Sequence, residues 1–236
     1  MEYVDYNNLD LSELELIGSG SFGEVYKCDD LAIKIYDSAT YDCDNIHIDI
    51  FEDLRDIDLP GFLKLVDYST VMCRKEKLSK KRDYNVDEKE VINAYSSKFI
   101  EASKEKMIDK PIEYTLNTLY EFKKVLDELN KRKILISDPH NENVIINDNN
   151  LVIIDPDLYR YHPNPDKMNN KRIKEFIIDL WCEEYGVYEH KNWYNIGEYF
   201  EGSNMEDCIK NMKEKVRTKT PRECLDNNEL LGYFKK

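Results

Sequence analysis

No stretch of the sequence approaches the ~18 consecutive apolar residues that a membrane-spanning helix needs, so we expect no transmembrane segment. The first residues, Met1 to Tyr6, also lack the basic start and the apolar stretch of a secretory signal. Six cysteines are present, but none form a C-x-x-C pair and no Cys/His cluster has the spacing of zinc ligands. Reduced structural thiols are the simplest interpretation, and we expect a cytoplasmic protein.

Basic residues are few relative to acidic ones, and the formal net charge is -14. A surface with this excess of negative charge repels nucleic-acid backbones and anionic membranes. We therefore expect no nucleic acid and no membrane among the partners. The substrate, whether a protein or a small hydroxyl-bearing molecule, is expected to be neutral or basic.

The remaining composition supports a folded core, because 41% of the 236 residues are hydrophobic and 35% are charged. Strand-like runs dominate the first third, and helical periodicity dominates after it. The pattern predicts strands at 14–17, 24–27, 31–36, 62–68 and 70–74, a loop at 75–87, helices at 44–56, 88–107, 114–130 and in segments beyond 171, and a hairpin at 144–154. We predict an α+β fold with a strand-rich lobe of residues 1–75 and a mainly helical lobe of residues 76–236.

Glycine is scarce, yet three of the eight glycines fall close together at Gly18, Gly20 and Gly23. The segment matches G-x-G-x-x-G-x-V, in which missing side chains let backbone N–H groups approach a phosphate. In dinucleotide-binding proteins a similar motif leads from a strand into a helix. Here a strand-like run follows, which favours a phosphate loop between two antiparallel strands. A purely structural glycine turn is the alternative.

The next predicted strand carries a Leu-Ala-Ile-Lys run that ends at Lys34. An ammonium at this point could bind the phosphates that the glycine loop faces. A cation inside a cleft needs a carboxylate to hold it in place, and Glu52 in the predicted helix is our choice. Asp49 and Asp53 are nearby alternatives, and a solvated acidic helix face remains open as well.

A second group of polar residues lies in the helical half. Asp138 and Asn143 form D-x-x-x-x-N, and Asp155 follows the predicted hairpin in an Asp-Pro-Asp run. In phosphoryl transfer, Asp138 would accept the proton of the acceptor hydroxyl and orient it for in-line attack. Asn143 and Asp155 would supply hard oxygen ligands to Mg²⁺, which bridges the phosphates.

Taken in this order, the glycine loop, the Ala-Ile-Lys run, the Asp138/Asn143 pair and Asp155 resemble the protein kinase superfamily. The match runs from residue 16 to residue 157. The resemblance implies a bilobal fold, ATP as the phosphate donor and Mg²⁺ as the metal. The cofactor-binding positions that it implies are Gly18, Ser19, Gly20, Ser21, Phe22, Gly23, Val25, Ala32, Lys34 and Glu52.

The second half departs from the family pattern. Ile-Ser-Asp, ending at Asp138, replaces H-R-D, and the missing arginine is the one that would contact a phosphorylated activation loop, so we expect no such switch. His140 makes the loop similar to that of aminoglycoside and choline phosphotransferases. It would either hydrogen-bond the γ-phosphate or hold the loop together. Asp157 replaces the glycine of D-F-G and could be an extra metal ligand.

The segment after Asp157 is also shorter than the family pattern. No A-P-E sequence follows, and Asp179-Leu180-Trp181 resembles the D-x-W of the next large helix in protein kinases. A plain amphipathic helix explains this run equally well. A shortened segment leaves less platform for an extended peptide, which puts a protein substrate in doubt.

Three functions remain open from the sequence. The first is a serine/threonine-type protein kinase, which the match over residues 18–34 favours. The second is a small-molecule phosphotransferase acting on a cationic alcohol, which His140, the short segment and the acidic charge favour. The third is a nucleotide-binding pseudokinase that regulates a partner by contact. The retained polar residues argue against the third function, because a silent domain has no chemical need for all of them.

Overall fold

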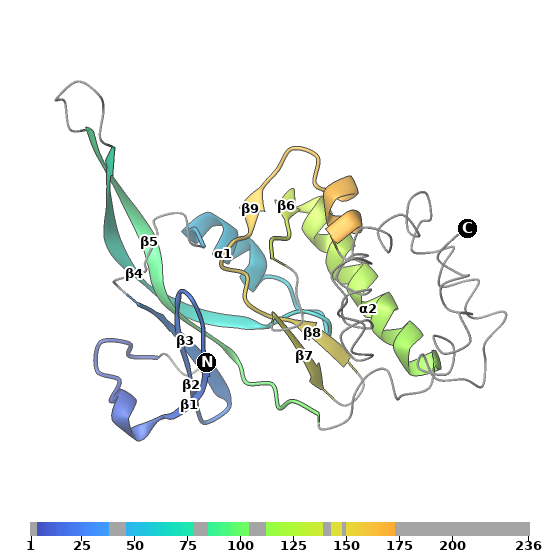
Figure 1. Ribbon diagram of the computed structural model, residues 1–236, viewed down its shortest axis with the longest axis horizontal. Helices are drawn as coiled ribbons and strands as arrows, with labels where there is room; N and C mark the ends of the chain where they lie inside the picture. The colour runs from blue at the N-terminus through green and yellow to red at the C-terminus, as the bar shows by residue number, and fades with distance from the viewer. Residues whose placement is uncertain are drawn as a thin grey trace, which may run out of the picture. The chain divides into compact units, whose positions relative to one another are not determined.

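The computed structural model describes residues 4–37, 46–77, 85–103, 112–138, 143–147 and 150–172. Within these ranges the fold is α+β, with a five-stranded antiparallel sheet, two small two-stranded sheets and helices (Figure 1). The predicted fold class is therefore confirmed at this level. None of the helices in the described ranges is long and apolar enough to cross a membrane.

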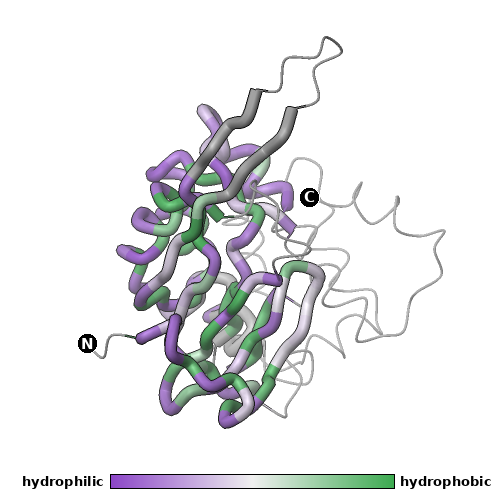
Figure 2. Tube along the Cα trace, turned by 90° about the vertical axis from the view of Figure 1, so that its left-hand side faces the viewer, coloured by the Kyte–Doolittle hydropathy of each residue, from purple (hydrophilic) through white to green (hydrophobic). Residues whose placement is uncertain are grey.

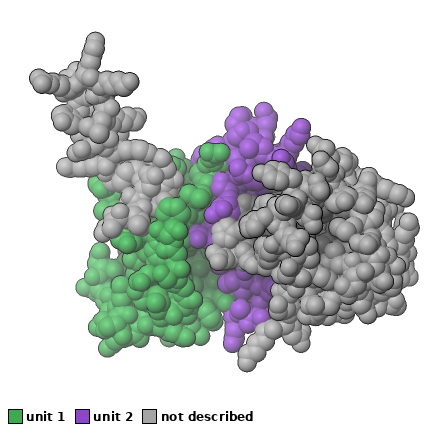
Figure 3. Space-filling view, in the orientation of Figure 1, with its two compact units in different colours: residues 1–58, 63–100, 156–160 green, residues 59–62, 101–155, 161–236 purple. Residues whose placement is uncertain are grey.

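The chain divides into two compact units, coloured separately in Figure 3. Unit 1 comprises described residues of 1–58, 63–100 and 156–160, and unit 2 comprises those of 59–62, 101–155 and 161–236. The chain thus passes from unit 2 into unit 1 at Pro156 and returns to unit 2 at Tyr161.

Unit 1 is built on the five-stranded sheet, which follows a short 3₁₀ helix η1 (Leu11–Glu13). Its strands are β1 (Glu15–Ser19), β2 (Gly23–Cys28), β3 (Leu31–Tyr36), β4 (Leu65–Lys77) and β5 (Asn85–Lys98), in the spatial order β1-β2-β3-β5-β4. The turn between β2 and β3 places Asp29 at φ 53°, a left-handed conformation that aspartate tolerates better than most residues. This tight turn sets β3 directly beside β2, with Val25 opposite Lys34.

Helix α1 (Ile48–Arg55) covers part of this sheet with one apolar face. Ile50, Phe51 and Leu54 are buried, and their spacing puts them on one side of the helix. The Phe51 ring packs edge-on against Tyr68 of β4 at 4.8 Å between centroids, which attaches α1 to the sheet. Figure 2 shows hydrophobic and hydrophilic residues interleaved along these elements, as half-buried layers require.

Strand β5 corrects the prediction of a helix over residues 88–107. Val91, Ile92, Ala94 and Tyr95 of β5 are all buried, although neighbouring residues of a strand point to opposite faces of the sheet. A strand that is covered on both faces carries apolar residues at neighbouring positions, a spacing that also fits a helix face. The predicted loop at 75–87 is also corrected in part, because β4 extends to Lys77, β5 begins at Asn85, and the two strands pair there.

The predicted lobe boundary near residue 75 does not coincide with the division into units. That position lies inside the β4–β5 hairpin, whose two strands pair from Leu65 to Lys77 and belong together in unit 1. The pairing of β5 with β3 extends the unit to about residue 100 along the chain.

Unit 2 contains the remaining elements. They are α2 (Ile112–Lys131), β6 (Ile134–Leu135), β7 (Val144–Asn147), β8 (Asn150–Ile153), the second residue of β9 (Arg160–Tyr161) and helical residues 166–172. The predicted helix at 114–130 and the predicted hairpin at 144–154 are both confirmed. Four α2 side chains form its buried face, namely Phe122, Val125, Leu126 and Leu129. The predicted helical segments beyond 172 lie outside the described residues.

Candidate functional site

The three polar residues predicted in the second half come together in unit 2. Asp138 ends the segment after β6, Asn143 directly precedes β7, and Asp155 follows β8. The Asn143 side chain donates from Nδ2 to the Asp138 carbonyl oxygen at 2.9 Å. The Asn143 carbonyl in turn accepts from the N–H of Ile154, next to Asp155, also at 2.9 Å. One asparagine therefore ties the segments of both aspartates together.

Both aspartates have a left-handed backbone. The φ angle is 53° at Asp138 and 58° at Asp155, a region that residues other than glycine enter at an energetic cost. Such conformations persist only where the surrounding structure imposes them, and they gather at active sites. In both segments the left-handed residue lies beside a hydrogen bond of Asn143.

A buried asparagine, which the sequence did not single out, anchors the segment that leads to Asp138. Asn169 lies on helical residues 166–172 and is fully buried. Its Oδ1 accepts from the N–H of Ile136 at 2.8 Å, and its Nδ2 donates to the Ile134 carbonyl at 2.9 Å and to Asn130 Oδ1 at 2.7 Å. A buried amide that is satisfied on both sides in this way fixes the backbone it contacts.

Arg172 adds a second anchor one helical turn along. Its guanidinium donates to the Ile136 carbonyl and, at 3.4 Å, to the Ser137 hydroxyl. The backbone N–H and the carbonyl of Ile136, two residues before Asp138, are thus both held by side chains of the same helix. Asn169 and Arg172 stand three residues apart, the spacing of neighbours on one helix face, but no local sequence pattern indicates what that face contacts.

In unit 1 the glycine-rich segment forms the turn between β1 and β2, as predicted, with Gly20 N–H donating to the Gly23 carbonyl at 2.9 Å. The two glycines differ in their surroundings. A Cβ atom on Gly23 would stand 2.1 Å from the Ile35 carbonyl oxygen, so the close approach of β2 and β3 requires glycine there. A Cβ on Gly20 would meet nothing within 4 Å, and the φ of Gly20 lies outside the left-handed region.

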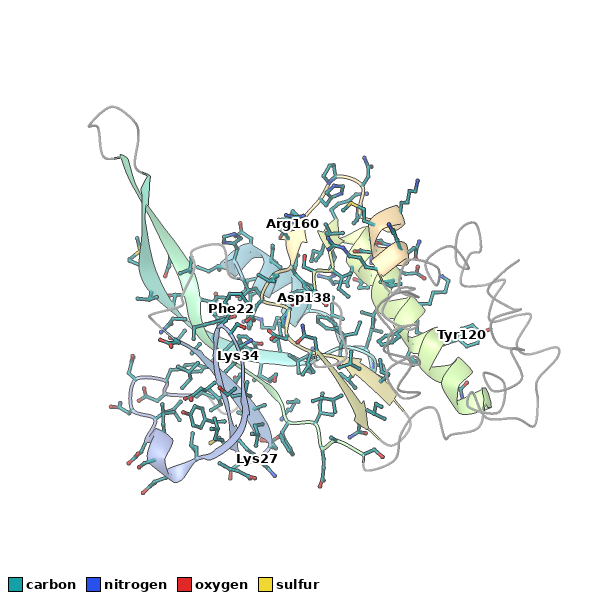
Figure 4. The ribbon with its side chains drawn as sticks, viewed as in Figure 1. Phe22, Lys27, Lys34, Tyr120, Asp138 and Arg160 are labelled. Carbon is teal, nitrogen blue, oxygen red and sulfur yellow. The ribbon has the colours of Figure 1, made fainter. Side chains whose placement is uncertain are left out.

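The other loop positions are arranged around this turn. Ser19 and Ser21 are exposed, and Phe22, labelled in Figure 4, is half-buried. Val25 and Ala32 are also half-buried and lie on the paired strands β2 and β3. A Cβ atom on Gly18 would lie 3.7 Å from the Val25 Cβ, an ordinary packing distance, so a side chain would fit there.

Lys34 is buried in β3, and its partner differs from the prediction. Its Nζ lies 2.5 Å from Oδ2 of Asp157, and only 7% of Lys34 and 2% of Asp157 are exposed. The hydroxyl of Tyr36 donates to the other oxygen of the same carboxylate at 2.7 Å. Asp157 was predicted as an extra metal ligand, but this structure gives both of its oxygens to protein donors of unit 1.

Glu52, the predicted partner of Lys34, has other contacts. Its carboxylate forms an ion pair with Arg55, one turn along α1. It also accepts a hydrogen bond from the Tyr68 hydroxyl, which raises the pKa of Tyr68 above its ordinary value. The prediction that Glu52 holds Lys34 is therefore corrected: helix periodicity located acidic residues on α1 but could not show which way each one pairs.

A scan against protein-family models and a search of the curated proteins found no match.

The donors near Asp155 fit a magnesium ion. The Asp155 carboxylate and the Asn143 side-chain amide carry hard oxygen atoms, and the Ile154–Asn143 hydrogen bond keeps their backbones adjacent. The described residues contain no group of three His, Cys, Asp or Glu residues suited to a metal. Magnesium commonly takes only one or two protein carboxylates and completes its shell with water and substrate phosphates, so such a group is not needed.

Two predicted positions lie outside the described residues. They are His140, between Asp138 and Asn143, and the run Asp179-Leu180-Trp181. The roles predicted for them remain predictions.

Proposed function

We propose that the protein is an ATP- and Mg²⁺-dependent phosphotransferase with a bilobal, protein-kinase-like arrangement, most simply a serine/threonine-type protein kinase. One observation supports this most strongly: Asn143 bonds the segments of Asp138 and Asp155 together. A structural turn needs neither two carboxylates nor their joint connection through an asparagine.

Each residue then has a distinct task in phosphoryl transfer. Asp138 orients the acceptor hydroxyl and accepts its proton. Asn143 and Asp155 would hold Mg²⁺, which would neutralise phosphate charge during transfer. The loop at Gly20 leaves room for phosphates beside exposed backbone, and Lys34 supplies a positive charge to them.

A small-molecule acceptor is the second candidate. The segment after Asp157 is short: it passes through β9, which pairs with β6, and reaches helical residues 166–172 directly. Little of this segment is free to form a platform for an extended peptide. The net charge of -14 favours a cationic alcohol over an anionic one.

Transfer from γ-labelled ATP tests the proposal. The purified chain is incubated with labelled ATP, Mg²⁺ and either a generic basic protein or a set of small cationic alcohols. Label on the chain itself or on the basic protein supports a protein kinase, and label only on a small alcohol supports the second candidate. ATP binding without transfer to any acceptor would instead indicate a pseudokinase.

The variant Asp138→Asn tests whether Asp138 is the base that accepts the proton of the acceptor hydroxyl. Asparagine tolerates the left-handed backbone at least as well as aspartate, so the fold should be retained. Loss of the base should lower transfer by roughly 10²–10⁴-fold while ATP binding is unchanged. Asp58→Asn, at an exposed aspartate, is the matched control and should transfer phosphate normally. Normal transfer by Asp138→Asn would show that Asp138 is not the base.

A further inference from the structure

The contact between Lys34 and Asp157 has features that a surface ion pair lacks. The two residues are 123 positions apart in sequence, and both side chains are more than nine-tenths buried. Asp157 Oδ2 accepts from Lys34 and Oδ1 accepts from Tyr36, itself only 6% exposed. The Lys34 Nζ also lies 5.7 Å from the centre of the Tyr36 ring, within reach of a cation–π contact. The carboxylate is thus fixed from two sides (Figure 4 labels Lys34).

Burying two opposite charges costs several kcal/mol of desolvation per ion, which their attraction offsets only when the geometry is good. Removing one partner leaves an uncompensated charge in a low-dielectric environment and is strongly destabilising. A protein that needed only stability at this point would be served as well by apolar residues. The retention of a buried lysine therefore calls for a use of its charge.

Glu52, the carboxylate of α1 predicted to hold this lysine, is engaged elsewhere. Glu52 is engaged with Arg55 and Tyr68, and its side chain is 37% exposed, far more than Asp157. An exposed carboxylate screened by water positions a cation less firmly than a buried one does.

The Lys34–Asp157 contact matters for the proposed site because Asp157 lies close to Asp155 in the chain. Asp157 follows the proposed metal ligand Asp155 by two residues, so their Cα atoms lie within ~7 Å of each other by chain length alone. The intervening Pro156 has a fixed φ, and its carbonyl accepts from the N–H of Tyr159 at 3.0 Å. The backbone between the lysine's partner and the metal ligand is therefore short and stiff.

We propose that Asp157, and not the predicted Glu52, is the positioning residue of Lys34: it holds the ammonium where the phosphates of the nucleotide bind. This inference rests on the proposed phosphotransferase function. Asp157 acts through Lys34 rather than on the nucleotide, and the same short segment carries the metal ligand Asp155. The phosphate-binding cation and the metal-binding carboxylate are thereby set by one stretch of chain.

The test compares the affinities of ATP and adenosine for the full chain by isothermal titration calorimetry. Lys34 would contact only the phosphates, so a lysine that is no longer positioned weakens ATP binding and leaves adenosine binding unchanged. For Asp157→Asn we expect a loss of roughly ten- to hundredfold for ATP, the factor that corresponds to a hydrogen bond to a charged group. Equal losses for ATP and adenosine would show a merely structural role and overturn the proposal.

A double-mutant cycle identifies the residue through which Asp157 acts. Lys34→Met should weaken ATP binding by itself, and Asp157→Asn added to it should change the ATP affinity by no more than about twofold. A full additional loss in the Lys34→Met background would mean that Asp157 acts independently of Lys34, which contradicts the proposal. Glu52→Gln is the matched control and should leave the affinities for ATP and adenosine unchanged. A loss of affinity for ATP alone in this variant would show that Glu52 positions Lys34.

A second variant, Tyr36→Phe, tests the proposal if Asp157→Asn is unstable. If Asp157→Asn does not fold, Tyr36→Phe removes one of the two bonds to the carboxylate and should give a smaller loss, again for ATP and not for adenosine. No ATP-specific loss in Tyr36→Phe would then overturn the proposal. A wild-type chain that binds neither ligand would overturn the phosphotransferase function as well, whereas a wild-type chain that binds ATP with Asp157→Asn unaltered would overturn the positioning role alone.

Discussion

Two glycines of the β1–β2 turn are glycine for different physical reasons. At Gly23 the neighbouring strand leaves no room, since an added Cβ would stand 2.1 Å from the Ile35 carbonyl oxygen and 2.8 Å from the Tyr36 Cα. Backbone atoms cannot move aside as the end of a flexible side chain can. At Gly20 neither space nor φ demands glycine, and in the proposed function the absent side chain leaves the backbone open to the nucleotide phosphates.

Replacing Gly20 and Gly23 by alanine, one at a time, distinguishes the two explanations. Gly23→Ala should lower the free energy of unfolding by about 1–3 kcal/mol, the usual cost of overpacking, and should disturb the β2–β3 pairing. Gly20→Ala should leave the free energy of unfolding within about 0.5 kcal/mol of wild type but weaken ATP binding. Urea unfolding and ATP titration of both variants check this. A Gly20→Ala chain with wild-type ATP affinity would remove the loop from the proposed site.

Among the elements, helical residues 166–172 anchor the segment that leads to Asp138. Through Asn169 and Arg172 they hold the backbone of Ile134 and Ile136 on the approach to Asp138. The proposed catalytic aspartate thus depends on an element that follows it by about thirty residues in sequence.

Asn169→Ala tests this dependence. It leaves the Ile136 N–H, the Ile134 carbonyl and the Asn130 side chain without their partner, and each unsatisfied buried group costs about 1–3 kcal/mol. Thermal or urea unfolding should show this loss, and phosphate transfer should fall more than ATP affinity because Asp138 is displaced. Asn164→Ala, at an exposed asparagine just before the helix, is the control and should match wild type. Wild-type transfer by a folded Asn169→Ala chain would contradict the positioning role.

Elements with a clear single-sided pattern were predictable, and an element buried on both faces was not. The apolar face of α2, and the polar turn between the apolar strands β7 and β8, allow one interpretation each. Strand β5 places Val91, Ile92 and Tyr95 at spacings that suit a helix face and a buried strand equally. Its interior position in the sheet decides between them, and that position depends on distant strands.

For the molecule as a whole, the limit of sequence reasoning is set by separation along the chain. Asp138, Asn143 and Asp155 were predictable as a group because one hairpin joins them. The partner of Lys34 was not, because the sequence offered carboxylates on the next helix while the structure uses one 123 residues away. Asp157 belongs to unit 1 although its neighbour Asp155 belongs to unit 2, a crossing that no local pattern reveals.

The central proposal is that Lys34, Asp138, Asn143 and Asp155 act on the same nucleotide. The most direct measurement is a crystal structure of the chain with a non-hydrolysable ATP analogue and Mg²⁺. We predict that Lys34 lies within hydrogen-bond distance of the phosphate oxygens while Asn143 and Asp155 coordinate the metal. A nucleotide bound away from these residues, or Lys34 on a different surface from Asp155, would contradict the proposal.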